Sequence, residues 1–325
     1  MRLAASSDMV IAAILIVAMV VIGLINPAFW SLDNLFSLLK SNVVIGIMAL
    51  AVLLVMLSGG IDVSFTAFAV AGMYLTVRTM VDIGYDGVVL PLLAATGIGA
   101  ALGLVNALIV HKLRMIPLIV TLGTGAVVRG LVLGLVGTSI VNINKMPREL
   151  IAFGRSDILT MTNAGGTTFG LTAMLPIYLG LALVLHLVLT RTLIGRSVYA
   201  YGASPEAAKR VGFPIGRTLV FVYVTAGALA GLAGILQSAM IWQANPRDFL
   251  GWELDVIAAV VLGGASIFGG RGTVLGTVLG VFILVMIKNS LILMGIETTW
   301  QRVVVGGMLI AATALTALRD RKALV

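Results

Sequence analysis

Long apolar runs separated by short polar segments divide the chain into ten stretches. A helix that crosses a membrane needs about 20 apolar residues. With Asp62 counted as a break, the runs cover residues 9–25, 41–61, 63–77, 88–110, 116–137, 170–190, 218–244, 256–270, 273–296 and 303–318. The pattern predicts an all-α integral membrane protein with about ten transmembrane helices in one domain, residues 1–325. The runs at 63–77 and 256–270 are the shortest.

Composition supports this class of protein and excludes several others. The chain is 60 % hydrophobic and 10 % charged, whereas soluble domains carry about 25 % charged residues. Cysteine is absent, which excludes disulfides, thiolate metal sites and a cysteine nucleophile. The first run has no small-residue cleavage site before Pro27, so we interpret it as an uncleaved span and not as a signal peptide.

The positions of the basic residues predict an orientation. The net charge is +8, from 21 basic and 13 acidic residues, and basic residues concentrate in short cytoplasmic loops. Arg2 and the clusters at 111–114, 191–217 and 319–322 are separated by four, two and four predicted spans. They therefore all fit the cytoplasmic side, with both termini, while the loop at about 138–169 is periplasmic. The net charge of these cytoplasmic segments equals the +8 of the whole chain. The charge therefore indicates membrane topology and not a nucleic-acid partner.

A short capped helix is predicted inside the cytoplasmic segment 191–217. Ser204 is a typical N-cap, Pro205 suits the first helical position, and Glu206 places an acid at the positive end of the helix. Gly212 stands where helices commonly end in a left-handed residue. The pattern predicts a helix of seven residues that begins at Pro205, exposed to the cytoplasm as a rigid contact for another protein. A basic loop that only fixes the topology is the alternative.

The sequence E-A-A-x-x-x-G at 206–212 resembles the cytoplasmic loop of permease subunits in bacterial binding-protein-dependent ABC importers. In that family the helix docks into a groove on the ATP-hydrolysing subunit. The resemblance therefore implies ATPase coupling for the residues Ser204, Pro205, Glu206, Ala207, Ala208, Lys209, Arg210 and Gly212.

Other motifs narrow the resemblance to the ribose, xylose and galactose branch of these permeases. The sequence G-G-I-D-V-S at 59–64 is similar to that branch's G-G-I-D-L-S, and E-L-D-V-I-A-A-V-V-L-G-G at 253–264 is similar to its E-L-D-A-I-A-A-V-V-L-G-G. The segment G-G-R-G-T at 269–273 resembles its G-G-x-G-x. Phe65-Thr66 and Leu118 depart from the branch pattern, which fits a specificity other than ribose or one member of a heterodimeric pair.

The resemblance implies the partners. Two permease subunits, identical or related, would line a path at their interface in the bacterial inner membrane, in contact with membrane lipid. A separate ATPase would bind ATP and magnesium, so this chain holds no cofactor and no metal. A periplasmic sugar-binding protein would deliver the substrate.

Ionisable groups inside apolar runs are costly and need a partner or a function. Asp62 is interpreted as a cap on the following helix, assisted by Ser64, with contact to substrate hydroxyls as the alternative. Arg129 and Lys288 lie inside spans, and ion pairing is favoured over substrate contact for both.

Three further ionisable residues are assigned by position. Glu253 is placed at the outer end of a span, where it either docks a binding protein or is simply solvated. Glu253 and Asp255, two residues apart, are predicted to face different sides of their helix. His186, alone in an apolar stretch, is predicted to be a buried, hydrogen-bonded imidazole.

Uncharged polar groups suit a path for a polyol, because hydroxyl and amide groups exchange hydrogen bonds with it without an ion. The candidates for the translocation path are Asp62, Ser64, Asn42, Asn106, Thr121, Thr124, Tyr223, Gln237 and Asn289. Small residues permit close helix packing or a moving interface. The hinge and packing candidates are Gly59, Gly60, Gly263, Gly264, Gly272, Gly276 and Gly280. The similar segments at 57–64 and 262–269 hint at an internal repeat of the kind found in transporters.

No G-x-x-x-x-G-K-[ST] sequence and no nucleophile–histidine arrangement occurs, so the chain is predicted not to be an enzyme. The predicted function is that of the permease subunit of an ABC importer that carries a pentose, hexose or related furanose. An ion-coupled secondary transporter that uses Asp62, Arg129 or Lys288 is the alternative. An integral-membrane enzyme is the third and least supported hypothesis.

Overall fold

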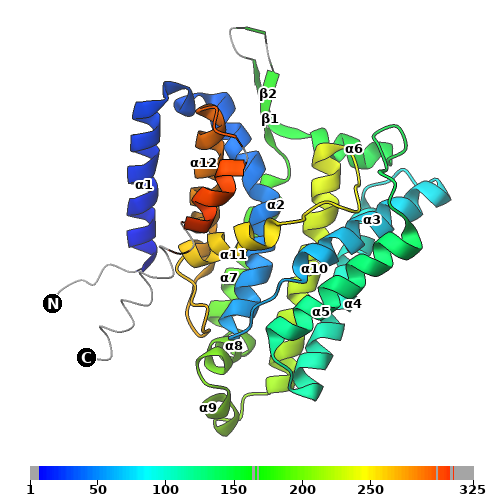
Figure 1. Cartoon of the computed structure of the whole chain (residues 1–325), viewed down its shortest axis with the longest axis vertical. Helices are drawn as coiled ribbons and strands as arrows, with labels where there is room; N and C mark the ends of the chain where they lie inside the picture. The colour runs from blue at the N-terminus through cyan, green and yellow to red at the C-terminus, as the bar shows by residue number, and fades with distance from the viewer. Residues whose placement is uncertain (1–6, 163–164, 167, 298, 308–309, 311–325) are drawn as a thin grey trace, which may run out of the picture.

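The computed structural model describes residues 7–162, 165–166, 168–297, 299–307 and 310. Figure 1 shows a bundle of helices with a β-hairpin at one end and the short helix α9 at the other. The α-helices are α1 (Ser7–Ile25), α2 (Leu32–Leu57), α3 (Phe65–Ile83), α4 (Val89–Leu113), α5 (Pro117–Leu131), α6 (Arg148–Arg155), α7 (Leu175–Arg191), α8 (Leu193–Ala203), α9 (Pro205–Arg210), α10 (Ile215–Ile241), α11 (Trp252–Leu262) and α12 (Val274–Leu293). A 3-10 helix (Pro27–Trp30) follows α1, and a π-helix (Val132–Val136) follows α5.

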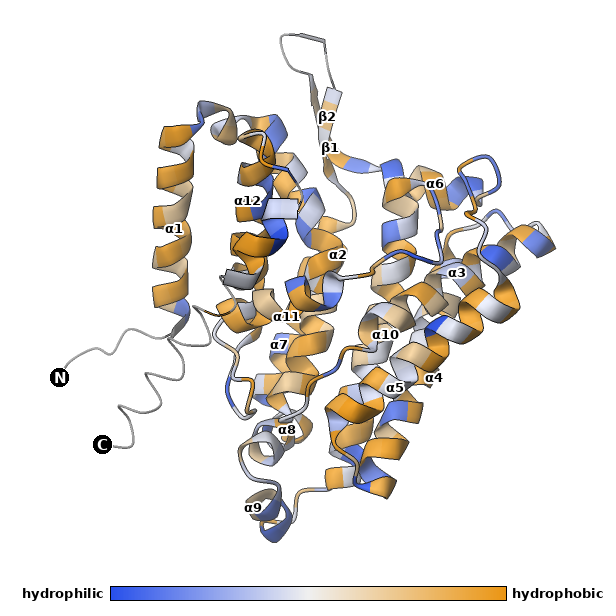
Figure 2. Ribbon diagram, viewed as in Figure 1, coloured by the Kyte–Doolittle hydropathy of each residue, from blue (hydrophilic) through white to orange (hydrophobic). Residues whose placement is uncertain are grey.

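The core is built around α2 and α10. From Val43 to Leu57, α2 is buried except at Ile45, because its apolar residues surround the whole helix and α10, α11, α12 and α7 pack around it. Such a helix is typical of the interior of a bundle. By contrast α1 packs mainly on α12 and leaves most of its apolar side chains exposed. Figure 2 shows the same hydrophobic exterior on α4 and α5, which suits contact with lipid or with another subunit.

Glycines bring α4 and α10 into direct backbone contact. A methyl group on Gly99 would collide with the carbonyl oxygen of Gly227, and one on Gly103 would collide with that of Tyr223. In the opposite direction, a methyl group on Gly231 of α10 would collide with the carbonyl oxygen of Ala95 of α4. The spacing of four residues places these glycines on one face of each helix. The absence of side chains at these glycines is what allows the two backbones to approach so closely.

The substitution Gly227→Ala is expected to destabilise the protein by about 1–3 kcal/mol, the usual cost of overpacking, because the backbone of α4 leaves no space for the methyl group. The free energy of unfolding, from a titration with a denaturing detergent, measures this effect. Gly97→Ala, on α4 with nothing within 4 Å, is the control and should be neutral or slightly stabilising. Equal stability of the two variants would contradict close packing at Gly227.

The glycines of α12 serve a second crossing, against α11. Methyl groups on Gly276 and Gly280 would collide with the carbonyl oxygens of Gly263 and Ala259. These contacts give a packing explanation for part of the predicted glycine set. The predicted hinge function of those residues stays a prediction.

The number of spans is not confirmed at ten. Six helices in the described part of the chain are long and apolar enough to cross a membrane, or seven if α7 and α8, bent by 76°, form one span. The predicted runs 9–25, 88–110, 116–137, 218–244 and 273–296 correspond to α1, α4, α5 with its π-helix, α10 and α12. The run 303–318 lies mostly outside the described residues, of which 299–307 are helical.

Three predicted runs differ from the helices that form. The helix α2 begins at Leu32, nine residues before the predicted run 41–61, because Ser31 caps it by accepting a hydrogen bond from the amide of Asn34 at 3.2 Å. The run 256–270 contains only the C-terminal part of the 11-residue helix α11, which begins at Trp252 and ends at Leu262, followed by a glycine-rich loop. The run 170–190 begins in a strand, so helix α7 starts only at Leu175.

The end of the molecule opposite α9 carries regular structure inside the segment predicted as a periplasmic loop, about 138–169. The segment 138–169 contains α6 and strand β1 (Asp157–Thr162), and β1 pairs antiparallel with β2 (Thr168–Thr172). The predicted all-α membrane class holds for the bundle, and this hairpin is an addition that the sequence did not predict. Phe36 of α2 packs against Phe169 of β2, with ring centroids 5.7 Å apart, and this contact ties the hairpin to the bundle.

Candidate functional site

The predicted capped helix forms as α9, at the far end of the bundle from the hairpin (Figure 1). The hydroxyl of Ser204 accepts a hydrogen bond from the amide of Ala207 at 3.2 Å. Gly212 has a φ of 89°, the left-handed conformation expected after the helix. The helix ends at Arg210, with Val211 as its C-cap, one residue earlier than predicted.

The surface of α9 is free to meet a partner. Glu206, Ala207, Lys209 and Arg210 are exposed, and the side chain of Val211 is 76 % exposed. Only Ala208 is buried, and it anchors the helix. The preceding helix α8, which the sequence had not indicated, begins immediately after a 76° bend from α7. Thr192 caps α8 through the amide of Gly195, and this Thr-x-x-Gly pattern is the local signal that could have revealed it.

Three glycine-containing segments meet at the end of α8 through their backbone atoms, and we name this contact the glycine junction. It comprises Gly59, Gly202 and Gly269–Gly270 with the carbonyl of Leu57. The amide of Gly270 donates to the oxygen of Leu57 at 3.0 Å. A methyl group on Gly202 would collide with that same oxygen and would lie 2.8 Å from the amide nitrogen of Gly270. The two glycine segments that hinted at an internal repeat therefore touch each other and the end of α8.

A buried polar cluster follows directly after Gly60. One carboxylate oxygen of Asp62, which is 2 % exposed, accepts from the amide and hydroxyl of Ser64 at 2.7 and 2.6 Å. Asn106 of α4 donates to the Ser64 hydroxyl at 2.9 Å, and Thr121 of α5 donates to the carbonyl of Ile61 at 3.2 Å. The N-cap residue of α3 is Ser64, and it makes no side-chain cap bond. Asp62 is therefore not the N-cap; its carboxylate instead bonds the backbone amide of Ser64, just before Phe65, where α3 begins.

The remaining path candidates are dispersed. Asn42 and Thr124 donate to carbonyl oxygens one turn earlier in their own helices. Gln237 is half-buried. The hydroxyl of Tyr223 and the side-chain oxygen of Asn106 are both buried, and neither has a hydrogen-bond partner among the described residues. The fold does not bring all of the candidate path residues together, and their function stays a prediction.

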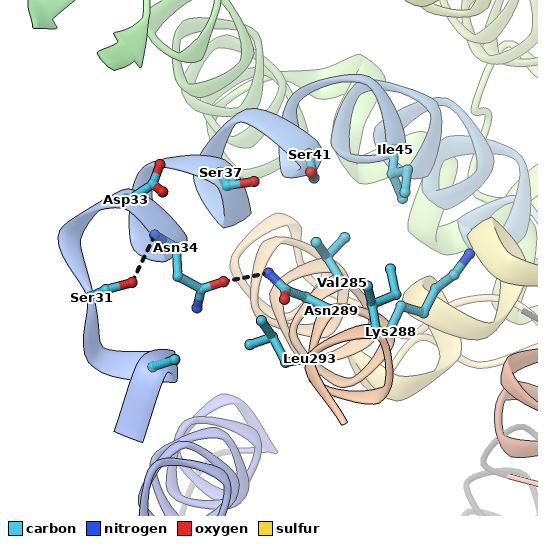
Figure 3. Close-up of a pocket in the computed structure, with 12 residues that line it drawn as sticks. Ser31, Asp33, Asn34, Ser37, Ser41, Ile45, Val285, Lys288, Asn289 and Leu293 are labelled. Carbon is cyan, nitrogen blue, oxygen red and sulfur yellow. Dashed lines mark hydrogen bonds between the residues drawn. The ribbon is translucent and has the colours of Figure 1, made fainter. Parts of the chain in front are cut away.

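A polar pocket opens between α2 and α12 (Figure 3), with a volume of about 600 Å³. Asn289, one of the candidates, donates to the side-chain oxygen of Asn34 across it at 2.9 Å. Figure 3 shows the side chains of Ser37 and Ser41 along the same pocket wall on α2. The further polar residues of the lining are Ser31, Asp33 and Lys288. Ser41, Lys288 and Asn289 lie in predicted runs. The other polar residues of the lining lie in the first turns of α2 or at its N-cap, before the predicted run 41–61 begins.

Both cations inside the spans have acidic partners, as predicted. Arg129 of α5 lies 3.3 Å from the carboxylate of Glu253, and Lys288 of α12 lies 2.7 Å from that of Asp255. The hydroxyl of Thr66 joins the first pair, 2.9 Å from Arg129 and 2.5 Å from Glu253. The two acids of α11 therefore face opposite neighbours, as their spacing indicated. Glu253 is neither free for docking nor simply solvated.

His186 differs from its prediction. It lies on an exposed face of α7 and not in the interior of this chain. The apolar side chains of Leu183, Val184 and Leu187 are exposed beside it. An apolar run shows that a helix is in the membrane, but it does not show which of its faces packs inside the chain.

Comparison with known proteins identifies the family. The chain matches, over residues 34–313, the family described as branched-chain amino acid transport system / permease component. The ribose import permease protein of Bacillus subtilis (strain 168) is 35 % identical over 308 residues, which are 95 % of this chain and 91 % of that protein. The galactose/methyl galactoside import permease protein of Haemophilus influenzae is 30 % identical over 332 residues, 95 % of each chain. The D-allose transport system permease protein of Escherichia coli (strain K12) is 28 % identical over 306 residues, 94 % of this chain and 90 % of that one.

No solved structure matches the chain. The sequence matches nevertheless cover the motifs at 59–64, 206–212 and 253–264 within residues 34–313. They confirm the resemblance drawn from those motifs, and the described structure supplies several apolar helices suited to a membrane. The chain belongs to the permease family of bacterial ABC importers that these relatives represent.

Proposed function

We propose that this permease carries a monosaccharide across the bacterial inner membrane, driven by ATP hydrolysis in a separate subunit that binds ATP and magnesium. The substrate class follows from the relatives, whose names give ribose, galactose and allose. A periplasmic binding protein delivers the sugar, and a second permease copy or a related permease completes the path.

The observation that carries the coupling to ATP is the exposed helix α9. Its cap at Ser204 and its left-handed end at Gly212 make it rigid, and its polar and basic face is free. A short rigid helix transmits a push from a partner better than a flexible loop does. We assign the docking contact to Glu206, Ala207, Lys209 and Arg210, with the α9 end and both termini in the cytoplasm and the hairpin in the periplasm.

The double variant Glu206→Arg, Gly212→Pro is expected to lower the amount of co-purifying P-loop ATPase about tenfold, which corresponds to about 1.4 kcal/mol of binding. The charge at the helix start is reversed, and proline cannot adopt the φ of 89° at position 212. The measurement is the ratio of ATPase to tagged permease after affinity purification.

Arg148→Glu is the matched control, because it reverses an exposed charge on the short helix α6 at the opposite end of the molecule. It should leave the ATPase ratio unchanged. Retention of the full complex by the α9 variant would refute the docking assignment, and uptake that stops on collapse of an ion gradient without any ATPase would refute the importer.

A further inference from the structure

A second pocket lies at the α9 end of the bundle, where α8 and α10 meet the glycine junction. Its volume is about 320 Å³, at the lower end of the range of about 300–1,000 Å³ for ligand pockets. Pro205, the first residue of α9, forms part of its wall. The pocket is therefore the size of a small solute and shares a wall with the proposed ATPase contact.

The lining of this pocket is aromatic and uncharged. Tyr201, Tyr223 and Phe268 contribute rings, and Ser58 adds a hydroxyl. None of the described residues that line it carries a charge. The pocket between α2 and α12, by contrast, is lined by Asp33 and Lys288. A few polar groups among aromatic side chains are typical of small-molecule sites. Without a counter-charge, the pocket suits a neutral solute.

Tyr223 supplies the second and independent observation. Its side chain is 1 % exposed, and its hydroxyl has no partner in the described structure. A buried tyrosine hydroxyl normally finds a hydrogen-bond partner, because leaving it unpaired costs free energy. Tyr223 is one of the residues that line the pocket, so its unpaired hydroxyl indicates a partner that arrives during function.

We propose that this pocket is a binding site for a small neutral polyol of monosaccharide size, with the Tyr223 hydroxyl as its buried hydrogen-bonding group. The rings of Tyr201 and Phe268 give the apolar face of such a solute a surface to pack on. The proposal rests on the proposed function and places a solute site at the α9 end of the path. Because Pro205 is in the wall, occupancy of the site is linked to the position of α9.

The absence of cysteine in the chain permits a direct test with a single introduced thiol. Ala203→Cys places the thiol on an exposed residue of the pocket wall, and its rate of modification by a small methanethiosulfonate reagent is measured on the full-length permease in lipid nanodiscs. D-ribose, D-allose and D-galactose are the probes. Ala207→Cys, the same substitution at an exposed position of α9 that does not line the pocket, shows any effect of sugar on the reagent itself.

At least one of these sugars is expected to slow modification at position 203 and not at position 207. Adding Tyr223→Phe should raise the sugar concentration for half-protection about fivefold, the effect of losing one neutral hydrogen bond. Tyr178→Phe is the matched control, because the Tyr178 hydroxyl is also buried and unpaired but lies on α7, away from the pocket. It should leave protection unchanged.

Two results would overturn the site: no protection by any of the three sugars, or equal protection in the Tyr223→Phe and parent proteins. Uptake of the same sugars by the complete importer, reconstituted with its ATPase and binding protein, is measured in parallel. Uptake without protection rejects the pocket and leaves the proposed function intact. Protection without ATP-driven uptake rejects the importer and leaves the pocket intact.

Discussion

Arg129→Gln is expected to destabilise the protein by about 1–3 kcal/mol, less than the cost of breaking a fully buried ion pair, because this pair is only partly buried. The guanidinium of Arg129 lies 3.3 Å from the Glu253 carboxylate, and the two side chains are 18 % and 24 % exposed. Glutamine removes the charge, so the carboxylate stays in its partly buried position with the hydrogen bond from the Thr66 hydroxyl. The free energy of unfolding in a denaturing-detergent titration measures the loss.

Arg78→Gln provides the matched control on an exposed pair. Arg78 lies 3.7 Å from Asp82 on α3, and these side chains are 43 % and 60 % exposed. Exposed pairs contribute only about 0–1 kcal/mol, so this variant should be close to the parent in stability. Exchanging the charges, Arg129→Glu with Glu253→Arg, should recover part of the loss. Equal stability of Arg129→Gln and Arg78→Gln would show that the Arg129–Glu253 pair contributes no more to the free energy of unfolding than the exposed pair does.

Gly202→Ala is expected to reduce sugar uptake by the complete importer about a hundredfold, which corresponds to about 2.7 kcal/mol against the working conformation. The added methyl group would collide with the carbonyl oxygen of Leu57 and press on the amide of Gly270. The hydrogen bond between those two groups, 3.0 Å long, would then be lost. Uptake of labelled sugar into proteoliposomes measures the effect.

The control for this prediction is Gly180→Ala on α7, where a methyl group meets nothing within 4 Å. Uptake by this variant should equal that of the parent. Because Gly202 lies outside α9, the Gly202→Ala complex should still retain its ATPase on purification, which separates failed transmission from failed docking. Normal uptake by Gly202→Ala would contradict a mechanical function of the glycine junction.

The long helices were predictable because an uninterrupted apolar run leaves few alternatives. The run 88–110 nearly coincides with α4 (Val89–Leu113). The run 218–244 overlaps most of α10 (Ile215–Ile241). The run 256–270 is equally apolar, but Gly264 adopts a φ of 81° and α11 has already ended at Leu262. Hydropathy alone does not distinguish a helix from a glycine-rich loop buried inside the protein, so this segment was assigned incorrectly.

The candidate site divides in the same way between local and long-range interactions. The cap of α9 depends on Ser204 and its next three residues, so the sequence contains all the information needed. The pairing of Arg129 with Glu253 joins residues 124 positions apart, and only the tertiary arrangement of the bundle, in which α3 packs on both α5 and α11, decides it. The same holds for the exposure of His186 and for the unpaired hydroxyl of Tyr223. Residue type indicated a need for a partner, but it did not identify the partner.

The glycine junction is made almost entirely of main-chain atoms: the amide of Gly270, the carbonyl of Leu57 and the backbone of Gly202. Main-chain atoms are the same whatever side chains surround them. Exchange of a side chain in either pocket, such as that of Tyr223 or Asn289, therefore leaves the atoms of the hydrogen bond between Gly270 and Leu57 in place. Gly59 and Gly202 belong both to the junction and to the wall of the pocket at the α9 end, so we expect sequence change among related permeases to be tolerated at the side chains of that wall and not at its glycines.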